Sequence, residues 1–184
     1  MSFCCGFIKD KPDDRDHKFC APPPCELGIP AAVDLAADYP PCLNQGNTNS
    51  CTSNATANAL LYLLRLANSA GASAVPQSRL FVYWNGRRIA GSPASADEGL
   101  SIRDAFKSVA RYNSIPETAW PFDPSRVTVQ PSAEAFQLAA LPDKFAYEAV
   151  PQDEAHVKSA LALRRPVILG IQLSESFYNV GGSG

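Results

Sequence analysis

The stretch from Asn44 to Ala57 constrains the fold of this chain most strongly, because it joins a polar loop to an apolar helix at a single cysteine. Its loop residues favour turns and helix caps. Leucines then recur at helical spacing, so we predict a buried central helix over residues 51–69 with Ser50 as its N-cap. Cys51 would lie in the first turn, where unpaired N–H groups and the helix dipole stabilise a thiolate. The stretch therefore predicts an activated thiol.

Composition excludes several classes of function. The chain has 184 residues and a formal net charge of −2, which argues against nucleic acid or an anionic membrane as the main partner. No apolar run approaches the ~20 residues of a membrane span. No secretory signal is visible at the start, so we expect an intracellular protein. No motif for a cofactor is present, and none is expected.

All six cysteines lie within the first 51 residues, which a disulfide-dense secreted scaffold would not show. One interpretation is a short bridge between Cys20 and Cys25, or a bridge from Cys42 to the N-terminal segment. A zinc site is the alternative, with the candidate ligands Cys4, Cys5, Cys20, Cys25 and His17. Its spacing lacks the CxxC knuckle of zinc sites, so we expect no metal.

The chain divides into three parts, and together they predict the α+β class. Residues 1–30 alternate in charge and then become rich in proline, so they form an N-terminal arm with no core of its own. Residues 31–144 form a helical subdomain, and residues 145–184 form a partial β-rich subdomain.

Several elements beyond the central helix are predicted from periodicity and capping. Further helices are expected over 78–88, 101–112, 132–138 and 153–163. Strands are expected over 145–150 and 167–171. One helix and two strands bury too little surface to stand alone, so the β-rich part is expected to be incomplete. His156 falls in the last helix and is interpreted as a structural or surface histidine.

The residues around Cys51 resemble the active-site stretch of papain-like cysteine peptidases. Asn44-Gln45-Gly46 precedes Ser50-Cys51, and Gln45 and Cys51 stand six positions apart. Thr52-Ser-Asn-Ala55 is most similar to a cathepsin-like branch of bacteria, archaea and large DNA viruses, with pandoravirus proteins as one candidate. A viral member would be expected in the host cytoplasm or the virion. Further segments resemble this branch in the same order, over 6–16, 32–35, 97–105 with 120–123, and 157–171.

The resemblance implies a papain-like fold of two subdomains and a cysteine endopeptidase that cleaves protein or peptide substrates. Cys51 would attack the scissile carbonyl, and Gln45 would donate its amide to the developing oxyanion. Gly99 would lie beside the substrate backbone, which pairs antiparallel. Leu100 would help line the apolar pocket for the residue two before the cut. The N-terminal arm would act as an intramolecular inhibitor in or beside the cleft.

The sequence departs from this family at three positions near the nucleophile. Asn49 replaces a common glycine, but asparagine tolerates the left-handed backbone region that this turn requires. Thr48 stands where the family has a structural cysteine, so that disulfide is absent. Thr52 stands where eukaryotic members have tryptophan.

The catalytic histidine and its orienting asparagine are also missing. In this family they follow the cysteine by about 130–150 residues, so the window begins at about residue 181. Neither His17 nor His156 matches the motif, and we expect both groups beyond residue 184. A catalytically inactive papain-fold binding or scaffold protein stays open as the alternative. A transglutaminase-like enzyme would not predict Gln45 upstream of the cysteine.

Overall fold

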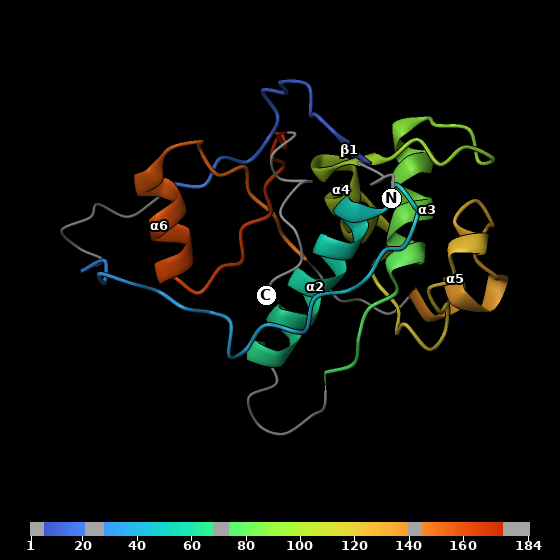
Figure 1. Ribbon diagram of the computed structural model, residues 1–184, viewed down its shortest axis with the longest axis horizontal. Coiled ribbons are helices and arrows are strands. Elements are labelled where there is room, and N and C mark those ends of the chain that lie inside the picture. Colours follow the sequence, from blue (N-terminus) through green and yellow to red (C-terminus); the bar gives the residue numbers. More distant parts are fainter. Residues whose placement is uncertain (1–5, 21–27, 68–73, 140–144, 175–184) are drawn as a thin grey trace.

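The computed structural model describes residues 6–20, 28–67, 74–139 and 145–174. Three helices, α2, α3 and α4, lie together at the centre of the molecule, with α5 beyond one end of this group and α6 beyond the other (Figure 1). The elements in chain order are β1 Phe7–Ile8, α2 Cys51–Ala67, α3 Arg79–Ala90, β2 Leu100–Ser101, α4 Ile102–Tyr112, the 3-10 turn η1 Pro124–Arg126, α5 Ala133–Ala139 and α6 Glu154–Ala162.

The predicted helices are confirmed, and their ends follow from capping residues. Ser78 caps α3 by accepting a hydrogen bond from the Phe81 N–H, and α3 ends at Gly91 in the left-handed region with φ of 81°. Ser101 caps α4 and Asp153 caps α6 in the same way as Ser78. The last two residues of the expected central helix lie outside the described residues.

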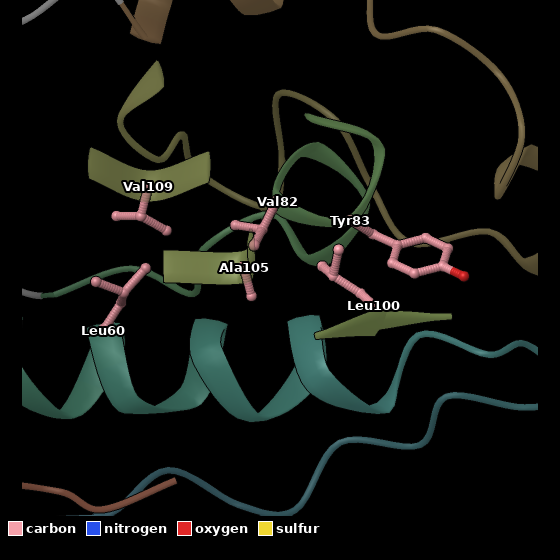
Figure 2. Close-up of a cluster of buried hydrophobic side chains, with 6 residues drawn as sticks. All are labelled: Leu60, Val82, Tyr83, Leu100, Ala105 and Val109. Atoms are coloured by element: carbon pink, nitrogen blue, oxygen red, sulfur yellow. The ribbon is translucent and has the colours of Figure 1, made fainter. Parts of the chain in front are cut away.

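The core lies between α2, α3 and α4. Figure 2 shows its main cluster, in which side chains from the three helices meet the one from β2. The buried members are Leu60, Val82, Tyr83, Leu100, Ala105 and Val109. A second cluster joins α3 to the segments that follow α4, and its largest members are Phe81 and Trp120. The helical half therefore forms a packed body that holds β2 in place.

The two strands predicted in the C-terminal part are wrong for the described residues. Residues 145–150 make a single parallel bridge, between Lys18 and Ala149. Residues 167–171 have no strand partner in the described part of the chain, and Leu169 and Ile171 are 64% and 63% exposed. Their β-branched pattern supplies strand propensity, but a strand also needs a neighbour for its backbone hydrogen bonds.

The N-terminal arm crosses the helical body. Residues Phe7–Ile8 of β1 pair in parallel with Leu100–Ser101 of β2. The arm then continues to the bridge with Ala149, next to which Phe19 is buried. Cys20 and Cys42 are free, exposed thiols, so neither takes part in the disulfides considered from the sequence. The arm is thus held in place by backbone pairing and burial.

The core assignment predicts a large stability difference between two leucines. Leu60→Ala removes a side chain that is buried between three helices, and we expect the free energy of unfolding to fall by about 2–4 kcal/mol. Leu138→Ala is the matched control, because Leu138 is exposed on α5. Urea denaturation followed by circular dichroism measures both. Equal losses for the two variants would contradict the placement of the core.

Candidate active site

Cys51 is the first residue of α2, as predicted, and its thiol is free and half-buried. Ser50 precedes it and is fully buried. The Ser50 hydroxyl lies 2.6 Å from the Thr48 hydroxyl and accepts a hydrogen bond of 3.0 Å from the Asn54 side-chain amide. The Ser50 carbonyl accepts the Asn54 backbone N–H at 3.0 Å. Thr48 and Asn54 therefore hold Ser50, directly before Cys51, from both sides.

Gln45 belongs to a tight turn that leads into this helix start. Its side-chain Nε2 donates to the Thr48 carbonyl at 2.8 Å, and the Thr48 hydroxyl donates to the Gln45 carbonyl at 2.9 Å. Gly46, within the turn, has φ of 56°, which glycine adopts without strain. Thr48 stands at the position of the absent structural cysteine and holds this turn through hydrogen bonds.

Arg79, at the start of α3, anchors the same turn, and no pattern in the sequence indicated this role. Its guanidinium pairs with Glu117 at 2.8 Å and is 12% exposed. It also donates to the Asn44 carbonyl and to Asn54 Oδ1, each at 3.1 Å. Because Asn44 adjoins Gln45 and Asn54 contacts Ser50, one partly buried ion pair supports the positions of both Gln45 and Cys51.

Asp97 joins the loop before Cys51 to the loop before β2. It accepts the Asn49 backbone N–H at 3.0 Å, and its own carbonyl accepts the Asn49 side-chain amide at 2.7 Å. The Tyr83 hydroxyl donates to the other Asp97 carboxylate oxygen and accepts the Gly99 N–H, the latter at 3.0 Å. Burial, reinforced by Asp97, raises the pKa of Tyr83 far above its usual value, so the hydroxyl stays protonated as a donor.

The peptide-binding residues expected from the sequence, Gly99 and Leu100, adjoin the nucleophile loop. Gly99 has φ of 93°, which strongly favours glycine. Thr52, directly after the nucleophile, donates its hydroxyl to the Leu100 carbonyl at 2.9 Å. The Leu100 side chain is fully buried in the core cluster, so its backbone is the part that faces the arm.

The arm lies over the junction of these two loops. The Gly6 carbonyl accepts the Leu100 N–H at 2.8 Å. A Cβ at Gly6 would overlap the Asn49 carbonyl oxygen, and a Cβ at Gly99 would overlap the Gly6 carbonyl oxygen. Two glycines therefore allow three backbones to meet beside the nucleophile turn.

The two histidines have other contacts. His156 Nδ1 lies 2.7 Å from the Asp153 carboxylate within α6, and the His17 carbonyl accepts the Ala149 N–H at 2.7 Å. No group of three or more His, Cys, Asp or Glu side chains in the described ranges is arranged to hold a metal ion. Among the same residues, no helix has both the length and the apolar character needed to cross a membrane.

Two known proteins are similar to this chain. An uncharacterized peptidase C1-like protein of Acanthamoeba polyphaga mimivirus is 30% identical over 196 aligned positions, which cover 94% of this chain and 62% of that protein. The structure of xylellain, a cysteine protease from Xylella fastidiosa, matches with a TM-score of 0.77 and 29% identity, and covers 88% of this chain. The resemblance to papain-like cysteine peptidases is confirmed.

The papain-like α+β fold follows from the same comparisons. The chain spans 62% of the length of the viral relative and 63% of the xylellain chain. No protein-family model matches the chain. The fold is thus established, whereas the domain boundaries and the roles of individual site residues stay predictions.

The Asn49–Asp97 link predicts a marked effect of a single carboxylate. Asp97→Ala leaves the Asn49 N–H and the Tyr83 hydroxyl without their partner, and we expect the free energy of unfolding to fall by about 1–3 kcal/mol. Hydrogen exchange at the Gly99 amide should accelerate in the same variant. Glu98→Ala, at the exposed neighbouring position, should change neither quantity. Unaltered stability and exchange in Asp97→Ala would show that the loops are held by other contacts.

Proposed function

We propose that the protein is a cysteine endopeptidase in which the Cys51 thiolate attacks the scissile peptide carbonyl. The observation that carries this proposal is the connection between the nucleophile turn and β2. Three hydrogen bonds, from Asn49 and Thr52, tie the turn to residues 97–100, where an extended chain is already paired. A peptide on that edge would present its carbonyl to the start of α2.

Gln45 is proposed as the side-chain donor to the oxyanion, alongside the Cys51 backbone N–H. Its turn is fixed through Thr48 and, at Asn44, through Arg79. A donor that is held in place before the reaction stabilises the developing charge without reorganisation, and loss of one such donor costs about 3–4 kcal/mol of transition-state stabilisation. A histidine base and an orienting asparagine, proposed to lie beyond residue 184, would complete the site.

The nucleophile assignment is tested by Cys51→Ala in the complete protein. Because the thiolate forms the covalent intermediate, we expect peptide cleavage to fall by about 10⁴-fold or more. Cys42→Ala removes another free, exposed thiol and should leave turnover unchanged. Release of a fluorogenic peptide product measures both variants. Retained turnover in Cys51→Ala would overturn the proposal.

We further propose that the N-terminal arm inhibits the enzyme by occupying this peptide-binding edge. Its support is the pairing of β1 with β2 and the contact of Gly6 with Asn49 and Gly99. The arm runs parallel to β2, whereas the substrate is expected to run antiparallel. The reversed direction would block the edge while keeping the arm's peptide bonds out of the productive orientation.

A single side chain at Gly6 tests the inhibitory role without deleting the arm. Gly6→Val places atoms against the Asn49 carbonyl, so the arm should leave the site. We expect alkylation of Cys51 to accelerate about tenfold, the effect of weakening the docking by ~1.4 kcal/mol. Peptide mapping of the modified protein reports Cys51 and, as internal control, exposed Cys42. Lys9→Ala, at an exposed arm position, should match the unchanged protein. Equal Cys51 rates in all three proteins would contradict inhibition.

A catalytically inactive papain-fold binding protein is the second candidate. It is favoured by the placement of His17 and His156, whose described contacts are with Ala149 and Asp153. Peptide binding by the complete protein without any cleavage would support this candidate over the peptidase.

A further inference from the structure

Arg103, in the first turn of α4, is the centre of the contacts between the arm and the helical body. Its guanidinium makes a two-point contact with the Asp16 carboxylate, with Nε 2.8 Å from Oδ1 and Nη2 bonded to Oδ2. Nη1 donates to the Lys11 carbonyl at 2.7 Å, and the Arg103 backbone N–H donates to Asp10 at 3.2 Å. With the arm in place the side chain is 15% exposed.

The position of Arg103 relative to the peptide-binding edge is informative. The described part of the arm begins at Gly6, which lies beside Asn49. The arm then pairs with β2 through Phe7 and Ile8 and reaches Arg103 at Asp10. Arg103 therefore stands at the end of this edge that is distant from the nucleophile turn. An extended chain that reaches Cys51 and continues along β2 about two residues beyond Ser101, as the arm does, passes close to Arg103.

We propose that Arg103 is a substrate-specificity residue, which binds an acidic side chain of the peptide when the arm is displaced. This inference rests on the proposed peptidase function of the same cleft. The arm supplies the structural precedent, since it pairs with β2 and two residues later places the Asp10 carboxylate 3.8 Å from the Arg103 guanidinium. The site would thus select peptides that carry Asp or Glu on the side N-terminal to the cut.

The chemistry of Arg103 fits a carboxylate ligand. A guanidinium offers parallel N–H donors that match the two oxygens of a carboxylate, a geometry that lysine cannot reproduce. The Asp16 hydrogen bond, with the charges of Asp10 and Asp13, raises the pKa of Arg103, so the group stays cationic. Asp104, on the same helix, is engaged by the Ser101 hydroxyl at 2.9 Å. Removal of the arm would leave the cation without its carboxylate partners on that side.

The register of the arm indicates which substrate position reaches Arg103. Phe7 is opposite Leu100 and Ile8 is opposite Ser101, and Asp10 follows two residues later. A substrate strand also rises by about 3.3 Å per residue. Its acidic residue would therefore lie about three to five residues away from the substrate residue that is opposite Gly99. Because the substrate is expected to run antiparallel to β2, this distance is counted toward its N-terminus.

The experiment compares peptides with glutamate or glutamine at each of these positions. The full chain carries Cys51→Ala to prevent turnover, Gly6→Val to move the arm off β2, and Asp10→Asn with Asp16→Asn to release Arg103 from the arm. Fluorescence anisotropy of labelled peptides gives the dissociation constants. At one position we expect the glutamate peptide to bind about fivefold more tightly than the glutamine peptide, which is the effect of a partly exposed ion pair. High salt should reduce this difference in affinity.

Two variants of Arg103 in the same background decide the result. Arg103→Gln should abolish the preference and leave the affinity of the glutamine peptide unchanged. Arg103→Glu should reverse the preference toward a lysine peptide, which a merely structural role would not do. In the control, Asp14→Asn at an exposed arm position replaces all three arm substitutions, and it should leave Arg103 covered by the arm.

The outcomes separate this inference from the proposed function. Equal binding of glutamate and glutamine peptides at every position would overturn the role of Arg103 and leave the peptidase proposal standing. A preference that persists in Arg103→Gln would overturn it as well. If no peptide binds, the peptide cleft itself is wrong and the inference falls with it. Loss of cleavage in the complete protein, with binding intact, would count against the peptidase alone.

Discussion

The hydrogen bonds between Asn49 and Asp97 are the constraint on which the candidate site depends. They join the loop before Cys51 to the loop before β2, the proposed peptide-binding edge, across 48 positions of sequence. The resemblance had located a missing disulfide in this loop, and the structure shows hydrogen bonds that hold the same region. Such bonds do not depend on the redox state of the compartment, whereas a disulfide does. Tyr83 extends the link to the Gly99 amide.

Two arginines, one at each end of α3, support this arrangement. Arg87 is fully buried at the end of α3, where it donates to the Ala96 and Val127 carbonyls. Burial lowers the pKa of Arg87, a cost that these hydrogen bonds and the Tyr83 ring offset. Arg79, which is partly buried and paired with Glu117, donates to Asn44 and Asn54 at the start of α3. The two ends of α3 therefore hold the loop before Cys51 and the loop before β2.

The sequence predicted the helices and the position of Cys51 at a helix start, because these depend on local periodicity and capping. It could not predict Arg79 or Asp97 as anchors, since their partners lie 14 to 48 positions away and follow no spacing rule. The strands over 145–150 and 167–171 failed for a related reason. Both segments have residues with high β-propensity, but a strand also needs a neighbouring strand to pair with, and propensity does not specify that neighbour.

The N-terminal arm combines a property that the sequence predicted with contacts that only the structure shows. Its alternating charges predicted a segment without a core, and the structure gives those charges a partner in Arg103 and its backbone a partner in β2. Its glycine at position 6 had no evident meaning in the sequence. In the structure it is the point at which the arm can approach Asn49 and Gly99 without a side chain.

We propose that the edge at Gly99–Leu100 binds a peptide backbone and places its scissile carbonyl beside Cys51. The most direct measurement compares two peptidyl electrophiles on Gly6→Val, one unmodified and one methylated at the amide nitrogens that would pair with this edge. Mass spectrometry follows labelling at Cys51 relative to exposed Cys42. We expect the unmodified reagent to prefer Cys51 and the methylated one to lose that preference. Equal selectivity of the two reagents would contradict binding at this edge.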